Sequence, residues 1–151
     1  MPSPKAVFGG EEMFRASPER LYAQLTDLDR MAKMLPDVVS TERVDDHSLR
    51  AVVRPGFSFL RGTMRLFIAL ADLAPPTAAG MNVTAEGIGV SMRVASTLRI
   101  AAEGAGSKLT WEARLEEVKG LAAALSPGLI KAAADQVIRH AWQQVRAELG
   151  E

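Results

Sequence analysis

Residues 16–39, ASPERLYAQLTDLDRMAKMLPDVV, predict two short helices directly after a first strand. Ser17 is a typical helix N-cap, and Pro18 suits the first helical turn because its missing N–H would be unpaired there in any case. The leucines that follow recur at helical spacing, so one face of this segment is apolar. A segment of this kind contains no metal box, phosphate loop or nucleophile, and we expect it to close over the end of a larger structure.

The second helix is predicted over residues 29–35, with Asp29 as its cap and Pro36 as the residue that prevents its continuation. Before the helix pair, AVFGGEEMFR (residues 6–15) predicts a strand. Its glycine pair suggests a β-bulge, since an isolated glycine within a strand pattern often marks one.

Downstream of the helix pair the hydrophobic period changes from that of a helix to that of an antiparallel sheet. The predicted strands are residues 38–44, 48–55, 63–76 and 80–87, followed by two strands around a glycine-rich turn within 90–118. Alternation is clearest in residues 90–100, where one face carries Val90, Met92, Val94, Leu98 and Ile100, with Ser96 among them. Period two with one apolar face indicates a sheet that is half buried against another layer.

The other layer is predicted at the end of the chain, in GLIKAAADQVIRHAWQQVRAEL (residues 128–149). Its apolar residues recur at helical spacing, at Ile130, Ala134, Val137, Ile138, Ala141 and Val145. About 20 helical residues span roughly 30 Å, which is enough to cross a sheet face. We therefore predict one α+β domain over residues 1–151, in which a curved antiparallel sheet of six to seven strands wraps around a long C-terminal helix.

Composition excludes several classes of function. The 151 residues suit one domain, and 18 basic residues balance 18 acidic ones, so no net field favours nucleic acid or an anionic membrane. Cysteine is absent, which excludes disulfides, thiol catalysis and cysteine metal sites, and is typical of a cytoplasmic protein. No segment has the length and hydrophobicity of a membrane span or a signal peptide, so we expect neither.

The order of elements resembles the helix-grip fold of the START/birch-pollen-allergen-like (SRPBCC) superfamily. Within it, FRASPERLYAQLTDLDRMAKMLP (residues 14–36), PGFSFLRGTMRL (55–66) and GSKLTWEARLEEVKGLAAAL (106–125) are similar to the family of the carbon monoxide dehydrogenase G subunit. Met34 stands where that family usually has cysteine. The resemblance implies an accessory role, either handling a hydrophobic carrier such as a quinone or helping a molybdenum hydroxylase to assemble.

The candidate catalytic groups are few and far apart. His47 falls in a predicted turn with two aspartates (residues 45–47), and His140 lies beside glutamines on the polar side of the last helix, so two exposed histidines are favoured over a metal or acid–base site. Glu116 and Glu117 are adjacent and therefore predicted on opposite strand faces, which argues against a carboxylate pair. We expect no metal, no cofactor and no catalytic residue.

The favoured function is binding of a lipophilic small molecule, lipid- or quinone-like, between the sheet and the last helix. The predicted lining residues are Met64, Leu66, Ile68, Met81, Val83, Met92, Val94, Leu109, Trp111 and Ala113 from strands, with Ala134, Ile138 and Trp142 from the helix. Methionine adapts to ligands of varied shape, although ordinary core packing is almost equally favoured for this set. A molybdenum hydroxylase partner and a homodimer stay open, as do two alternatives, a protein-interaction adaptor with a filled core and a cyclase-like enzyme.

Overall fold

The computed structural model describes residues 6–35, 37–54, 62–120 and 126–151. Its elements follow in the order β1 (Ala6–Phe14), α1 (Pro18–Leu25), α2 (Leu28–Met34), β2 (Val38–Asp45), β3 (Ser48–Val53), β4 (Met64–Ala74), β5 (Ala78–Gly87), β6 (Val90–Glu103), β7 (Gly106–Gly120) and α3 (Pro127–Glu148). The predicted helix-grip fold is confirmed, with seven strands and a single long last helix.

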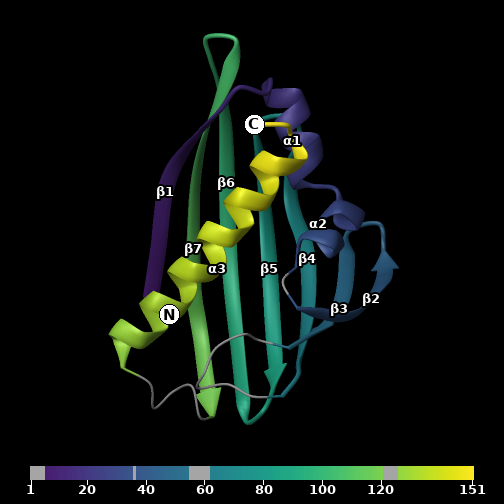
Figure 1. Cartoon of the computed structure of the whole chain (residues 1–151), viewed down its shortest axis with the longest axis vertical. Coiled ribbons are helices and arrows are strands. Elements are labelled where there is room, and N and C mark those ends of the chain that lie inside the picture. Colours follow the sequence, from purple (N-terminus) through teal and green to yellow (C-terminus); the bar gives the residue numbers. More distant parts are fainter. Residues whose placement is uncertain (1–5, 36, 55–61, 121–125) are drawn as a thin grey trace.

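The strands form one antiparallel sheet in the order β1-β7-β6-β5-β4-β3-β2. The first strand therefore pairs with the last, and β1 and β2 are the edges. Figure 1 shows α3 crossing one face of this sheet diagonally, with α1 at the end where α3 finishes and α2 further down at the side of β3 and β4. Among the described residues no helix has the length and hydropathy needed to cross a membrane.

The buried side chains form three separate groups, which we call the upper, lower and lateral clusters after their places in Figure 1. The upper cluster joins α1, the end of α3 and the sheet, and consists of Phe14, Ala16, Leu21, Tyr22, Ala79, Ile100, Leu109, Val145 and Leu149. The lower cluster consists of Val53, Met64, Ala85 and Val90, and the lateral cluster of Leu28, Leu49 and Ile68. Among the described residues, the apolar side chains in the middle of the sheet face are half buried and lie at the edges of these clusters.

The predicted start of the first helix is confirmed. The Ser17 side chain accepts a hydrogen bond from the Arg20 N–H (3.3 Å), and Pro18 occupies the first turn of α1. These contacts satisfy one of the backbone donors that every helix N-terminus leaves unpaired.

The predicted cap of the second helix is wrong, because α2 begins at Leu28 and its N-cap is Asp27. A carboxylate oxygen of Asp27 accepts from the N–H groups of Asp29 (3.0 Å) and Arg30 (3.2 Å). Asp29 therefore lies inside the first turn of the helix, where its charge faces the positive end of the helix dipole. Pro36 lies outside the described residues.

Strand β7 contains a bulge that the sequence did not reveal. Arg93 of β6 lies opposite Glu117 and Val94 lies opposite Leu115, so Glu116 has no counterpart on β6. The prediction that Glu116 and Glu117 point to opposite faces rested on strict alternation, which this bulge interrupts. Glu117 instead pairs with Lys119 (2.6 Å) and with Arg93 (3.5 Å), and Glu116 is exposed, so the two carboxylates do not form an inward pair.

Polar contacts fix the last turn of α3 to the corner between β1 and α1. The carboxylate of Glu151 accepts from the N–H groups of Arg15 (2.8 Å) and Ala16 (3.0 Å). Arg20 donates to the carbonyl of Leu149 (3.1 Å), and Arg146 donates to the carbonyl of Met13 (2.8 Å). We call this set the clamp, and it secures α3 at its C-terminal end.

We predict that Glu151→Ala lowers the free energy of unfolding by about 1 kcal/mol, because two backbone donors lose a charged acceptor but regain water. Glu151→Gln keeps one accepting oxygen and should cost less. Urea denaturation measures both, with Glu148→Ala as the control because Glu148 is exposed one turn away. Equal stability of Glu151→Ala and the wild type would show that the clamp does not depend on this residue.

A second prediction distinguishes the two aspartates at the start of α2. Asp27→Ala should destabilise the protein by about 1 kcal/mol through loss of the N-cap. Asp29→Ala removes an exposed ion pair with Arg43 and a charge in the first turn of α2, and we expect the smaller loss because both interactions are exposed to solvent. Thermal unfolding of the two variants side by side checks the order, and a larger effect at Asp29 would contradict it.

Candidate functional site

The inner face of the sheet carries a band of apolar side chains that are only half buried. Along β4 to β7 the residues of the band are Leu66, Met81, Val83, Met92, Val94, Trp111 and Ala113. They lie between the three clusters, and several pack against a cluster edge while keeping part of their surface open. Inward apolar residues in a fully packed domain would be buried, so the band marks the part of the sheet that the helices do not close.

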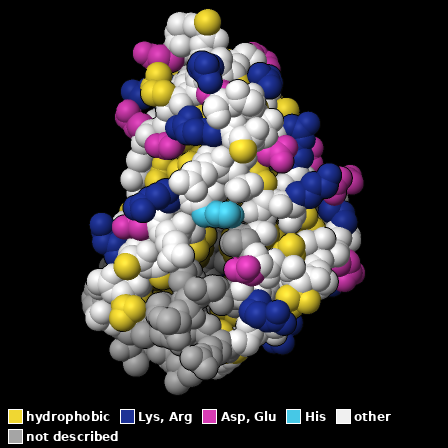
Figure 2. All heavy atoms as spheres, in the orientation of Figure 1, with side chains coloured by type: hydrophobic (Ala, Val, Ile, Leu, Met, Phe, Trp, Pro, Cys, Tyr) yellow, Lys and Arg dark blue, Asp and Glu magenta, His cyan; other side chains and the backbone are white. Residues whose placement is uncertain are grey.

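The facing wall is α3, and its burial changes along its length. Val145 and Leu149, near its C-terminal end, are buried, whereas Ala134, Ile138 and Trp142 are half buried. Figure 2 shows patches of apolar side chains scattered among backbone and charged atoms on this face of the molecule. Two half-buried apolar walls thus face each other between the helix and the sheet. We call the region bounded by these two sets of half-buried side chains the furrow.

The structure distributes the 13 predicted lining residues between the band, the facing wall and the clusters. Ten are half buried, seven on the sheet and three on α3. Met64 (3% exposed), Ile68 (3%) and Leu109 (0%) lie on the same sheet face but inside the clusters, so they do not border the furrow.

Three half-buried apolar residues belong to this region although the sequence analysis did not include them among the lining residues. Phe8 lies opposite Ala113, Leu98 lies opposite Trp111, and Val118 lies opposite Met92. Phe8 could have been predicted, because Phe8 and Phe14 are an even number of residues apart and so lie on the same face of β1. The glycine pair between them suggested a bulge instead, which would have broken this alternation. Leu98 was assigned to the inner face but not to the lining.

Two tryptophans meet at the upper end of the furrow. Trp111 comes from β7 and Trp142 from α3, and their ring centroids are 6.0 Å apart, with Phe14 at 6.1 Å from Trp142. Both indole Nε1 atoms are shielded from solvent, and no described residue offers either of them an acceptor. An unpaired buried donor costs about 1–3 kcal/mol.

The glycine pair of β1 makes room for one of these rings. The predicted bulge is wrong, because β1 pairs with β7 in unbroken register through Gly9 and Gly10. Gly10 lies directly opposite Trp111, and a Cβ at position 10 would meet three atoms of the indole ring at 3.3–3.4 Å. The glycine therefore lets the indole lie over the edge strand.

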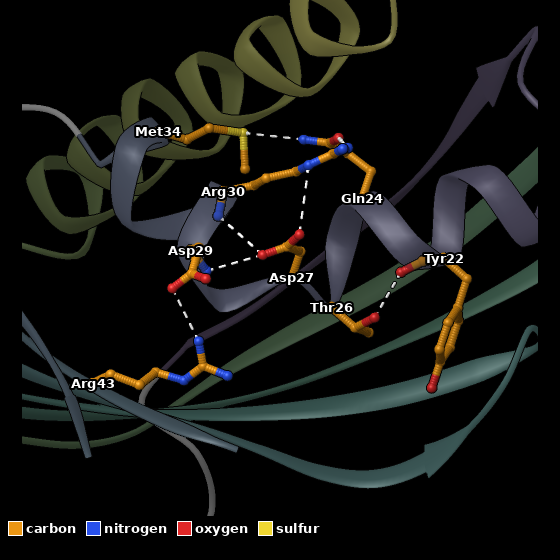
Figure 3. Close-up of polar contacts among 8 residues, drawn as sticks. All are labelled: Tyr22, Gln24, Thr26, Asp27, Asp29, Arg30, Met34 and Arg43. Atoms are coloured by element: carbon orange, nitrogen blue, oxygen red, sulfur yellow. Dashed lines mark hydrogen bonds and ion pairs between the residues drawn. The ribbon is translucent and has the colours of Figure 1, made fainter. Parts of the chain in front are cut away.

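The corner between α1 and α2 is organised by a buried amide (Figure 3). Gln24 is 0% exposed, its Oε1 accepts from Arg30, and its Nε2 lies 4.0 Å from the sulfur of Met34. Arg30 also pairs with Asp27 (3.5 Å), so one side chain links the N-cap of α2 to the interior of α1. This network keeps the two short helices together beside the furrow.

The titratable groups with clear pKa shifts have local structural causes. The N–H of His47 donates to the carboxylate of Asp45 (2.8 Å) in the β2–β3 turn and lowers its pKa, and the Lys119 ammonium lowers the pKa of Glu117 on the outer face. Burial raises the pKa of the Tyr22 hydroxyl. None of these three groups belongs to the band.

The two histidines lie in different elements of the fold. His47 is exposed in the turn between β2 and β3, as predicted, and His140 is half buried on α3 rather than fully exposed. Within the part of the chain that the structure describes, no three side chains among His, Asp and Glu converge as metal ligands would.

Two open surface depressions lie away from the furrow. One, of about 480 Å³, is bordered by charged and small residues of β5 to β7, including Arg99 and Lys108. The other, of about 360 Å³, lies at the β5–β6 turn beside Gly120. Neither is lined by a residue of the band or of α3, so we do not assign the site to them.

The sequence and the fold were each compared with those of known proteins. The family model for the G subunit of carbon monoxide dehydrogenase (CoxG) matches residues 10–150. No curated protein matches the sequence.

Three solved structures illustrate the fold. A conserved protein from Geobacillus kaustophilus has 18% identity and a TM-score of 0.88, over 96% of this chain and 95% of that chain. Ara h 8.0201 has 14% identity and a TM-score of 0.72 (97% and 99%), and a START superfamily protein from Mycobacterium smegmatis has 14% identity and a TM-score of 0.67 (94% and 95%). At these identities the likeness shows the fold alone.

The placement of the histidines gives a prediction. Replacing His47 and His140 together by Ala should leave thermal stability and the binding of an apolar fluorescent probe nearly unchanged, because neither lies in the band. The measurements are a melting curve and a probe titration. A loss of binding above about tenfold, or 1.4 kcal/mol, would show that a histidine belongs to the site.

Proposed function

The chain belongs to the CoxG family, that of the carbon monoxide dehydrogenase G subunit, and on that basis we propose that it binds a lipophilic small molecule, lipid- or quinone-like, in the furrow between β4–β7 and α3. One observation carries this proposal: the apolar side chains of both walls are half buried although they face each other. A ligand that filled the furrow would remove both apolar walls from water.

The composition of the band suits a ligand of variable shape. Met81 and Met92 are flexible and polarizable, and they stand beside stiffer residues such as Val83 and Val94. Burying about 300 Å² of apolar ligand surface at roughly 25 cal/mol/Å² gives an upper bound near 7 kcal/mol before the cost of association. Micromolar binding is therefore within reach without any charged contact.

We propose binding without catalysis. The band consists of Leu, Met, Val, Trp and Ala side chains, so a reaction there would have no acid, base or nucleophile of its own. The charged residues of the central strands lie on the opposite face, where Arg65 pairs with Glu86 and Arg93 with Glu117.

The family description also supports an accessory role beside a molybdenum hydroxylase of the carbon monoxide dehydrogenase type. In that role the protein would handle the lipophile for the enzyme or help it to assemble. The gene neighbourhood tests this part, because adjacent genes for such a hydroxylase would support it, and their consistent absence would argue against it.

We predict that Val94→Trp abolishes binding of the neutral probe N-phenyl-1-naphthylamine with little loss of stability. Val94 lies in the band, so a larger side chain should occupy the furrow, whereas overpacking a closed core costs about 1–3 kcal/mol. Fluorescence titration and thermal unfolding measure the two effects.

Arg93→Trp is the matched control, because the neighbouring residue is exposed and its ion pair with Glu117 is a surface one. It should change neither probe binding nor melting temperature by much. A sharp fall in the melting temperature of Val94→Trp, in a protein whose wild type never binds the probe, would overturn the proposal. The adaptor with a filled core would then take its place.

A further inference from the structure

The two tryptophan side chains at the upper end of the furrow carry an inference about the ligand. Their Nε1 atoms are two of four buried side-chain polar atoms without a partner among the described residues. Of the other two, the Tyr22 hydroxyl belongs to the upper cluster, against which both tryptophans pack, and the Ser48 hydroxyl lies at the start of β3. Buried polar groups in native proteins are nearly always paired, so two unpaired donors in one aromatic contact require an explanation.

We propose that the lipophile carries a neutral hydrogen-bond acceptor, a carbonyl or ether oxygen, that receives the indole N–H of Trp111, of Trp142 or of both. The inference rests on the proposed function and deepens it. One tryptophan belongs to the sheet and the other to α3, and their rings are 6.0 Å apart, so an oxygen at this end would contact both walls. Both side chains are half buried, and the Trp111 Nε1 lies over Gly10 of the edge strand, 3.3 Å from the position of a Cβ there.

The surroundings favour a neutral acceptor over a carboxylate. Among the described residues, Arg146 is the cation that contacts this aromatic group, with its guanidinium 4.3 Å from the ring centre of Phe14. Arg146 is already engaged by the carboxylate of Glu12 (3.1 Å) and the carbonyl of Met13 (2.8 Å). An anionic headgroup at the tryptophan pair would therefore lose its hydration without gaining a free cation.

The neighbouring strands hold the tryptophan rings in place without using the indole N–H groups. Gly10 lets the Trp111 ring lie over β1, and Leu98 lies opposite Trp111 on the other side. Apolar contact holds both rings, so the indole N–H groups are not needed for their position. Phenylalanine at either place would keep an aromatic ring while removing the N–H donor and part of the ring volume.

The test compares two probes of nearly the same shape, 2-acetylnaphthalene and 2-ethylnaphthalene, which differ by a carbonyl in place of a methylene. A purely apolar furrow would prefer the ethyl compound, because the carbonyl loses hydration on burial. We expect the wild type to bind the acetyl compound about tenfold more tightly by calorimetry. Trp111→Phe with Trp142→Phe should reduce this ratio to twofold or less.

The test uses the ratio of the two affinities, acetyl over ethyl compound. Any space left by the smaller phenylalanine ring changes both affinities alike, so its effect cancels in the ratio. A structural role alone would not change it. Nitrogen-15 correlation spectra supply a second readout: the chain has two tryptophans, and the acetyl compound should shift at least one of their two indole N–H signals downfield.

The outcomes separate the two proposals. If the wild type binds both probes equally, or prefers the ethyl compound, the acceptor inference is overturned while the furrow remains a binding site. If the acetyl preference survives in the double variant, the tryptophans are not its source and the inference is likewise overturned. If neither probe binds to the wild type, both proposals fall.

Discussion

The attachment of α3 at one end determines most of what is distinctive in this molecule. Val145 and Leu149 are buried beside α1, and the clamp adds hydrogen bonds from Glu151, Arg20 and Arg146 to the same corner. Towards its N-terminal end the same helix keeps its apolar face half buried over the middle of the sheet. A helix packed along its whole length would have produced one continuous core. A helix fixed at one end produces an upper cluster and a furrow.

Most of the fold could be predicted from sequence because its signals are local. The change from helical to alternating period, the Ser17 cap and the apolar stripe of residues 128–149 all act within a few residues of where they occur. Predictions were wrong where two neighbouring residues could both serve the same local role. They were also wrong where a feature depends on residues distant in the sequence. Asp27 and Asp29 are both acceptable caps, and only the actual start of α2 selects the first. The β7 bulge depends on the register against β6, which no short window contains.

The candidate site was less predictable than the fold. Alternation along a strand predicts on which face of the sheet a side chain lies, but it does not predict how deeply that side chain is buried. Leu66 and Ile68 are two residues apart on the same face of β4, yet Ile68 is buried in the lateral cluster and Leu66 is half buried. That difference depends on where α2 and α3 pass over the sheet. The glycines of β1 show the same limit: they looked like an interruption of the strand, but they accommodate a tryptophan of β7 that is distant in the sequence.

The distribution of polarity across the sheet explains how such a furrow can select its ligand. Outer-face charges pair across strands, as Arg65 does with Glu86, so ionic contacts stay in solvent and contribute little to stability. On the inner face the hydroxyl of Ser96 donates to the carbonyl of Met81 (3.0 Å), which leaves no free donor at that point. Shape and apolar area would therefore determine affinity over most of the furrow, without discriminating between lipophiles of similar size. Directional selectivity requires an unpaired donor, and among the described residues two such donors, the indole N–H groups of Trp111 and Trp142, lie beside the band.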